Sequence, residues 1–243
     1  MNNSKFHKMK IINLKRFFCT TPILIIIFFL NFSGVTISGY IINCEVQDIK
    51  EGTIMVLWDI DKESGIGKSV VRNGKFQFTS NIKLEEPKVV WITTKYDPQN
   101  PEYRKTLVFI LDNGIINIKS DFENFKYAEI KGNKIYDYRT LLLSQTLNYE
   151  KKIDSIYSLY KDKTRDALEI QKQENIVVKK RDSIVKNFIQ KHPNNYYSLC
   201  RLTNLTPIFT KEELKNIYQA MDKELQETIR GKKLNEKILL PSY

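Results

Sequence analysis

Alternation of apolar and polar residues predicts a series of short β-strands between Val35 and about Lys131. The segments are rich in β-branched and aromatic residues, and polar turns separate them. They read VTISGYIINCEV, GTIMVLWDI, SVVRNGKFQFTS, KVVWITTKY, KTLVFILDNG and IINIKS. Six to eight strands in a stretch of about 95 residues fit a β-sandwich or a partly open barrel.

Two Asn-Gly pairs mark tight turns within this region. Asn73-Gly74 lies between SVVR and KFQF, and Asn113-Gly114 lies between LVFILD and IINIK. Asn-Gly is typical of the type I′ turn, because glycine adopts a positive φ without a Cβ clash. We therefore expect a β-hairpin at each pair.

The apolar period lengthens to three or four residues after Gly132, which predicts two long amphipathic helices. A short polar break near Lys161–Thr164 separates them, so they should fold back on each other as an antiparallel hairpin. The apolar stripes are Ile135, Tyr138, Leu142, Tyr149, Ile153, Ile156 and Tyr160, then Ile170, Val177, Ile184 and Phe188.

Shorter helices are predicted towards the C-terminus. Pro193 should end the second long helix, and a short segment follows around 196–204. Thr210 and Glu213 have the spacing of a capping box, and Gly231 is interpreted as the residue that ends a helix. The predicted class is α+β: an antiparallel β-sandwich or partly open barrel, then a helical hairpin and short C-terminal helices. The predicted domains are residues 35–131 and 132–243.

The first 34 residues have the features of an export signal. Five basic residues, from Lys5 to Arg16, precede the run TPILIIIFFLNF. The strictly apolar part, Ile23–Leu30, is much shorter than the ~20 residues of a spanning helix. A cleaved signal is favoured, and a retained anchor that would attach the chain to the membrane is the alternative. Neither Cys19 nor Cys44 stands where lipidation requires a cysteine.

The net charge of +11 is unevenly distributed. Residues 40–131 have 13 Lys or Arg against 14 Asp or Glu, whereas residues 132–243 have 21 against 14. An exported protein without a zinc-finger, phosphate-loop or RNP-like motif is not expected to bind nucleic acid. An acidic partner or lipid surface should instead dock on the helical hairpin, at Lys151, Lys152 and Lys179–Arg181, with Trp58 and Trp91 as the alternative.

Residues that could perform catalysis are scarce. His7 and His192 are the two histidines, and His192 is interpreted as a helix-end residue beside Pro193. No C-x-x-C motif is present. Cys44 and Cys200 would either pair in an oxidising compartment or lie buried on separate elements. We therefore predict no catalytic, cofactor-binding or metal-binding residue.

Other candidate residues have ordinary structural interpretations. The acidic pairs, Glu85-Glu86 and Asp59 with Asp61, are interpreted as solvated loop residues. The aromatic residues Trp58, Trp91, Tyr96 and Tyr103 could line a binding face, although strand aromatics more often pack in a core or across strands.

Several segments, in order and with matching gaps, resemble a known family. They are ISGYI, VVRNGKFQFTS, VFILDNGIINI, AEIKGNKIYDY, FIQKHPNNYYSL and IRGKKLNEKI, between about Thr36 and Ile238. The chain is similar here to the DUF4369-type domain of unknown function. This domain precedes a thioredoxin-like domain in exported thiol:disulfide oxidoreductases related to TlpA and AhpC/TSA proteins.

The resemblance implies an accessory module in the periplasm or cell envelope of a Gram-negative bacterium. Family members continue into a thioredoxin fold with a C-x-x-C, whereas twelve residues follow Gly231 here. The first interpretation is a non-catalytic binding module whose partner is an envelope protein, with a thioredoxin-like protein as first candidate. The alternatives are a truncated oxidoreductase whose redox domain is on another chain, and a structural envelope protein.

Overall fold

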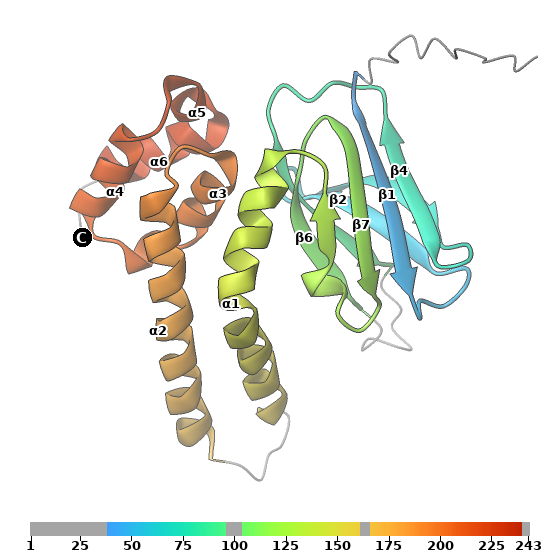
Figure 1. Ribbon diagram of the computed structural model, residues 1–243, viewed down its shortest axis with the longest axis horizontal. Helices are drawn as coiled ribbons and strands as arrows, with labels where there is room; N and C mark the ends of the chain where they lie inside the picture. The colour runs from blue at the N-terminus through green and yellow to red at the C-terminus, as the bar shows by residue number, and fades with distance from the viewer. Residues whose placement is uncertain (1–37, 96–103, 161–165, 240–243) are drawn as a thin grey trace, which may run out of the picture. The chain divides into compact units, whose positions relative to one another are not determined.

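The computed structural model describes residues 38–95, 104–160 and 166–239. Eight strands occupy the N-terminal part of these ranges, as the alternating pattern predicted (Figure 1). Their bounds are β1 Tyr40–Gln47, β2 Ile54–Asp59, β3 Ser64–Val70, β4 Lys75–Ser80, β5 Lys88–Thr94, β6 Thr106–Leu111, β7 Gly114–Asp121 and β8 Glu129–Lys131.

The strands form two four-stranded sheets that do not close into a barrel. The first sheet has the order β4-β1-β7-β8, and the second has the order β3-β2-β5-β6. All pairs are antiparallel except β1 with β7, which run parallel from Tyr40 opposite Gly114 to Gln47 opposite Asp121. The predicted α+β class is therefore confirmed, with one parallel pair in a mostly antiparallel structure.

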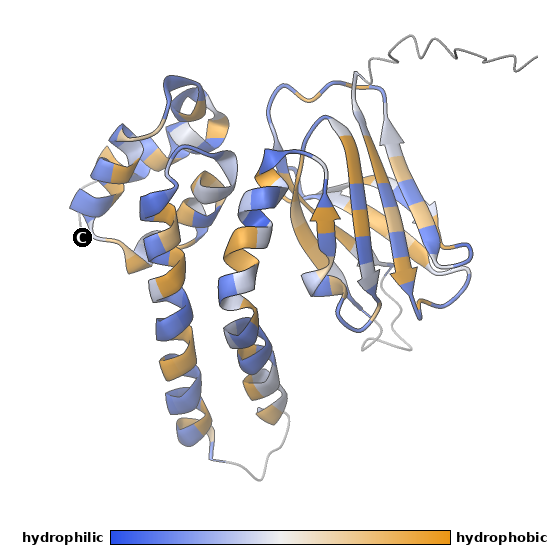
Figure 2. Cartoon of the chain, viewed as in Figure 1, coloured by the Kyte–Doolittle hydropathy of each residue, from blue (hydrophilic) through white to orange (hydrophobic). Residues whose placement is uncertain are grey.

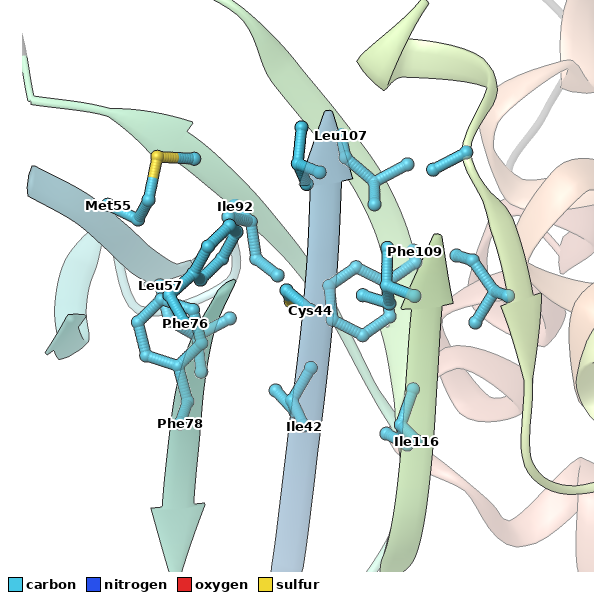
Figure 3. Close-up of a cluster of buried hydrophobic side chains, with 14 of the residues drawn as sticks. Ile42, Cys44, Met55, Leu57, Phe76, Phe78, Ile92, Leu107, Phe109 and Ile116 are labelled. Atoms are coloured by element: carbon cyan, nitrogen blue, oxygen red, sulfur yellow. The ribbon is translucent and has the colours of Figure 1, made fainter. Parts of the chain in front are cut away.

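The inner faces of the two sheets share one hydrophobic core (Figure 3). Ile42 and Ile116 enter it from the first sheet, and Leu57, Ile92 and Phe109 enter it from the second. The alternation of side chains along a strand explains this arrangement, because every second residue faces inward. The same alternation is visible as apolar and polar bands along β1 and β7 in Figure 2.

The turn at Asn73-Gly74 has the predicted type I′ features. Both residues have positive φ, 50° and 71°, and Arg72 and Lys75 exchange two backbone hydrogen bonds of 2.9 Å. The flanking strands then separate, because β3 pairs with β2 and β4 pairs with β1, so the predicted hairpin is limited to the turn and the single bridge between Arg72 and Lys75. This turn therefore joins the two sheets at a corner.

The hairpin predicted at Asn113-Gly114 is wrong. Gly114 has the expected positive φ of 102°, but β6 lies at the edge of the second sheet and β7 lies inside the first. The Asn113 side chain accepts a hydrogen bond from Leu84 N at 2.8 Å and donates one to Leu84 O at 2.9 Å. Asn113 thus holds a crossover between sheets by binding a distant loop.

Helices follow the strands, and α1 and α2 form the predicted hairpin (Figure 1). The predicted break at 161–164 lies outside the described residues. Pro193 follows the end of α2, and Thr210 and Glu213 form the predicted capping box. The bounds are α1 Lys134–Leu159, α2 Ala167–Lys191, α3 Tyr196–Asn204, α4 Lys211–Gln219, α5 Lys223–Glu227 and α6 Ile229–Leu239, with short 3-10 turns at η2 Phe125–Tyr127 and η3 Thr206–Ile208.

The helices pack on the outer face of the second sheet. Val89 of β5 and Ile110 of β6 belong to the same apolar cluster as residues of α1 to α4 and α6. Tyr136 Oη of α1 donates to Ile110 O at 2.6 Å, and Tyr196 Oη of α3 donates to Pro87 O at 2.5 Å. The helices therefore cover one end of this face.

The prediction that Gly231 ends a helix is wrong. It lies in the first turn of α6 and is buried. An added Cβ would approach the carbonyl oxygens of Leu225 and Gln226 to 2.4 Å. The glycine is thus required by close packing against α5.

Candidate functional site

Trp58 and Trp91 form a stacked pair on the outer face of the second sheet. They lie directly opposite each other on β2 and β5, with ring centroids 6.3 Å apart and an interplanar angle of 29°. Both are half-buried. Their neighbours Leu57 and Ile92 point into the core, so alternation along the strands directs both indoles outward.

Apolar residues around this pair remain exposed to solvent. Ile54, Val70 and Val108 are 37%, 46% and 50% exposed, and Ile66 is 38% exposed. Gly65 lies opposite Trp58, where a Cβ would lie 3.7 Å from the indole, so this position places no side chain against the ring. We define the tryptophan face as Ile54, Val56, Trp58, Ile66, Val70, Trp91 and Val108.

A shallow cavity with cationic residues adjoins the tryptophan face. Its volume is about 200 Å³, and it is lined by Val56, both indoles, Thr93, Thr94, Lys95 and Arg104. Lys95, Arg104 and the nearby Lys68, which is opposite Val56, are exposed. Trp91 Nε1 is buried and has no hydrogen-bond partner among the described residues. The predicted Tyr96 and Tyr103 lie outside the described residues.

Asp59 is not a solvated loop acid, which corrects the sequence interpretation. It is 1% exposed at the end of β2. Its carboxylate accepts hydrogen bonds from Asp61 N at 3.1 Å and Lys62 N at 3.2 Å, and Lys88 Nζ lies 3.4 Å away. Burying a carboxylate is costly unless hydrogen-bond donors and a cation contact it, and Asp59 has both. Its two hydrogen bonds to backbone N–H groups fix the turn that follows β2.

Asp61 and Glu86 attach helix α6 to the strands and are also not free acids. Arg230 Nη2 donates to both oxygens of Asp61, at 3.1 and 2.9 Å. Glu86 accepts a hydrogen bond from Ile229 N at 2.9 Å, at the start of α6. Glu85 is exposed, as expected. Asp61 and Glu86 therefore hold helix α6 in place against the strand domain.

Cys44 and Cys200 are both free and buried. Cys44 lies in the core of the sandwich on β1, and Cys200 lies on α3 among the helices. Of the two interpretations left open, separate buried cysteines is confirmed. Burial raises the pKa of both thiols, that of Cys200 to about 12.

We expect both buried thiols to resist modification at pH 8. The thiolate is the reactive form, and a raised pKa lowers its population below that of an ordinary thiol. Reaction with an aromatic disulfide reagent should be at least about tenfold slower in the folded protein than in urea. A Cys19→Ser variant removes the remaining thiol. Equal rates in folded and unfolded protein would contradict the burial.

His192 is the C-terminal cap of α2, as predicted from its place before Pro193. It is half-buried, with its ring centroid 4.8 Å from that of Phe188 and 5.6 Å from that of Tyr138. The ring therefore packs against aromatic residues at the helix end.

The basic cluster on the hairpin is smaller than predicted. Lys151, Lys152, Lys179 and Lys180 are exposed. Arg181 is half-buried and is held by Asp182 at 2.7 Å and Glu150 at 3.8 Å. The four lysines are available to a partner, whereas Arg181 is engaged within the hairpin.

The described ranges contain no group of three or more His, Cys, Asp or Glu side chains arranged to hold a metal ion. Within the same ranges, none of the helices has the length and apolar character needed to cross a bilayer. The predicted export signal, residues 1–34, lies outside the part of the chain that the structure describes.

Comparison with known families identifies one domain. Residues 36–138 match the model of a domain of unknown function, DUF4369. The match covers strands β1 to β8 and the first residues of α1. Comparison with curated proteins and comparison with solved structures each found no match.

Proposed function

We propose that this chain, built around its DUF4369 domain, is an exported accessory module of the Gram-negative envelope that binds a protein partner and catalyses no reaction. The basic leader and apolar run of residues 1–34 support export. Burial of both described thiols, with pKa values raised above the ordinary range, supports a role without thiol chemistry.

The observation that carries the proposal is the tryptophan face. Large exposed apolar groups on a sheet, with tryptophan at their centre, are typical of the central part of protein interfaces. Burying them against a partner would be favourable by roughly 25 cal/mol per Å² of apolar surface. The helices leave this end of the second sheet uncovered, since they pack at Val89 and Ile110.

The charges around the tryptophan face favour an acidic partner. Lys68, Lys95 and Arg104 are exposed beside it, so a complementary surface would present apolar side chains flanked by carboxylates. By the family resemblance, a thioredoxin-like envelope protein is the first candidate. The four exposed lysines of the hairpin support a second docking element for an acidic partner.

A binding comparison with three variants tests the docking surface. Partner retained from envelope extract on immobilised protein should fall at least about tenfold with Trp58→Ala plus Trp91→Ala. The matched control reverses Lys151, Lys152, Lys179 and Lys180 to glutamate and should retain the partner. If only the control variant loses the partner, and binding to the unmodified protein weakens steeply with added salt, the docking surface is the helical hairpin. Retention by both variants would refute both surfaces. Thermal unfolding verifies that each variant is folded.

The exported form is expected to begin between about Ser33 and Gly39. The apolar run ends before this point and the strand pattern begins within it. N-terminal sequencing of protein from the envelope fraction measures the cleavage site. Recovery of intact Met1 in the membrane pellet would instead support the retained anchor.

A further inference from the structure

A cavity of about 120 Å³ lies where α1 and α3 cover the second sheet. Its apolar wall includes Val89, Ile110 and Ile135. Its polar wall includes Arg139, Tyr197, Arg201 and Asn204. Val108 and Asn204 are exposed, so the cavity reaches solvent beside these two residues.

Arg139 is a buried residue at this cavity and has few protein partners among the described residues. The residue is 8% exposed. Its Nη1 donates to Ala128 O at 2.9 Å, which is its one hydrogen bond within the described residues. A guanidinium group carries five N–H donors and stays charged in proteins. Burial lowers the pKa of Arg139, which reflects the cost of keeping this charge away from water.

Arg201 brings a second guanidinium to the same cavity. Its Nε is buried and lacks a hydrogen-bond partner within the described ranges. Tyr197 lies four residues earlier, on the same face of α3. Tyr197 and both arginines line the same cavity. Burial raises the pKa of Tyr197, and the positive charges of Arg201 and Arg139 oppose that rise.

No carboxylate of the described residues lies within 4.0 Å of either guanidinium. Two carboxylates lie close enough to influence the tyrosines, Glu150 near Tyr197 and Asp112 near Tyr136. Glu150 is paired with Arg181, and Asp112 accepts hydrogen bonds from Asn133 Nδ2 at 2.6 Å and Asn113 N at 2.8 Å. The positive charge at the cavity is therefore not neutralised by a direct ion pair.

We propose that this cavity binds a small organic carboxylate, held at Arg139, Arg201 and Tyr197, with its short apolar tail against Ile110 and Ile135. Guanidinium groups match the geometry of a carboxylate, and a buried charge is stabilised when such a partner arrives. The volume approaches that of cavities that hold one benzene molecule, about 150 Å³, so the tail is limited to a few carbon atoms. The apolar wall offers no donors for the far side of a tetrahedral phosphate.

Butyrate, with its neutral amide and inorganic phosphate for comparison, is a suitable probe. Titration of the purified full chain, followed by NMR of the arginine side chains, should show saturable binding of butyrate with shifts at Arg139 and Arg201. Butyramide and phosphate should bind at least about tenfold more weakly, because one lacks the charge and the other cannot use the apolar wall.

Substitutions separate a binding role from a structural one. Arg201→Met and Arg139→Met should each weaken butyrate binding at least about tenfold, while Arg72→Met, at an exposed arginine elsewhere, should not. Thermal unfolding of each ligand-free variant verifies that it is folded, since Arg139→Met also removes the hydrogen bond to Ala128 O. Equal binding of butyrate and butyramide, stronger binding of phosphate, or no butyrate binding would overturn the proposal. Unfolding of Arg139→Met together with unchanged binding in Arg201→Met would also overturn it.

Discussion

Replacing Phe109 by alanine is expected to cost about 3–5 kcal/mol of the free energy of unfolding. Phe109 is 3% exposed on β6 and points into the core shared by both sheets (Figure 3). Its removal leaves a cavity that rigid strands from two sheets can fill only in part. Domains of this size are commonly stable by 5–15 kcal/mol, so the loss would be a large fraction of the total.

Urea unfolding of Phe109→Ala beside Val108→Ala measures this effect. Val108 is the preceding residue on the same strand, faces outward and is 50% exposed. Its substitution should change the unfolding free energy by less than about 1 kcal/mol. Similar losses in the two variants would show that the inner and outer faces of β6 are wrongly assigned.

Replacing Gly231 by alanine is expected to destabilise the protein by about 1–3 kcal/mol. The new Cβ would meet two backbone carbonyl oxygens at 2.4 Å, and backbone atoms cannot rotate away as a side chain can. Helix α6 would have to shift from α5, which strains the contacts of Ile229 with Glu86 and Arg230 with Asp61.

Thermal unfolding distinguishes this clash from a general effect of substitution in α6. Lys233→Ala, at an exposed position in the same helix, serves as the control and should leave the midpoint nearly unchanged, because alanine favours a helix. A stabilised Gly231→Ala would mean that the helices separate more readily than their packing indicates.

The sequence pattern predicted most strands and helices but not how the strands pair. Period-two alternation identifies which face of a strand is buried, and it contains no information on the neighbouring strand. The parallel pairing of β1 with β7 and the crossover at Asn113 depend on contacts between residues distant in the chain. Gly231 was misinterpreted for a related reason, because its close approach to α5 arises from tertiary packing.

The roles of individual functional candidates were harder to predict than the secondary structure. A binding face that includes Trp58 and Trp91 is one of the two interpretations that the sequence allows, whereas the burial of Asp59 is not expected from it. Arg139 and Arg201 were overlooked, although Arg139 gives a recognisable signal. It lies four residues after Ile135 and three before Leu142, so a charge interrupts the apolar stripe of the first long helix.

The parallel pairing of β1 with β7 also sets an order for folding. Asn43 and Asn117 meet across this pair, joined by a hydrogen bond of 3.0 Å between residues 74 positions apart. Closing such a long loop costs conformational entropy before the contacts between β1 and β7 form, and this cost slows folding. A chain that emerges N-terminus first would present one edge of β1 unpaired until Asp121 is available. During that interval the exposed edge could pair with another copy, so the first sheet is where aggregation of the nascent chain would begin.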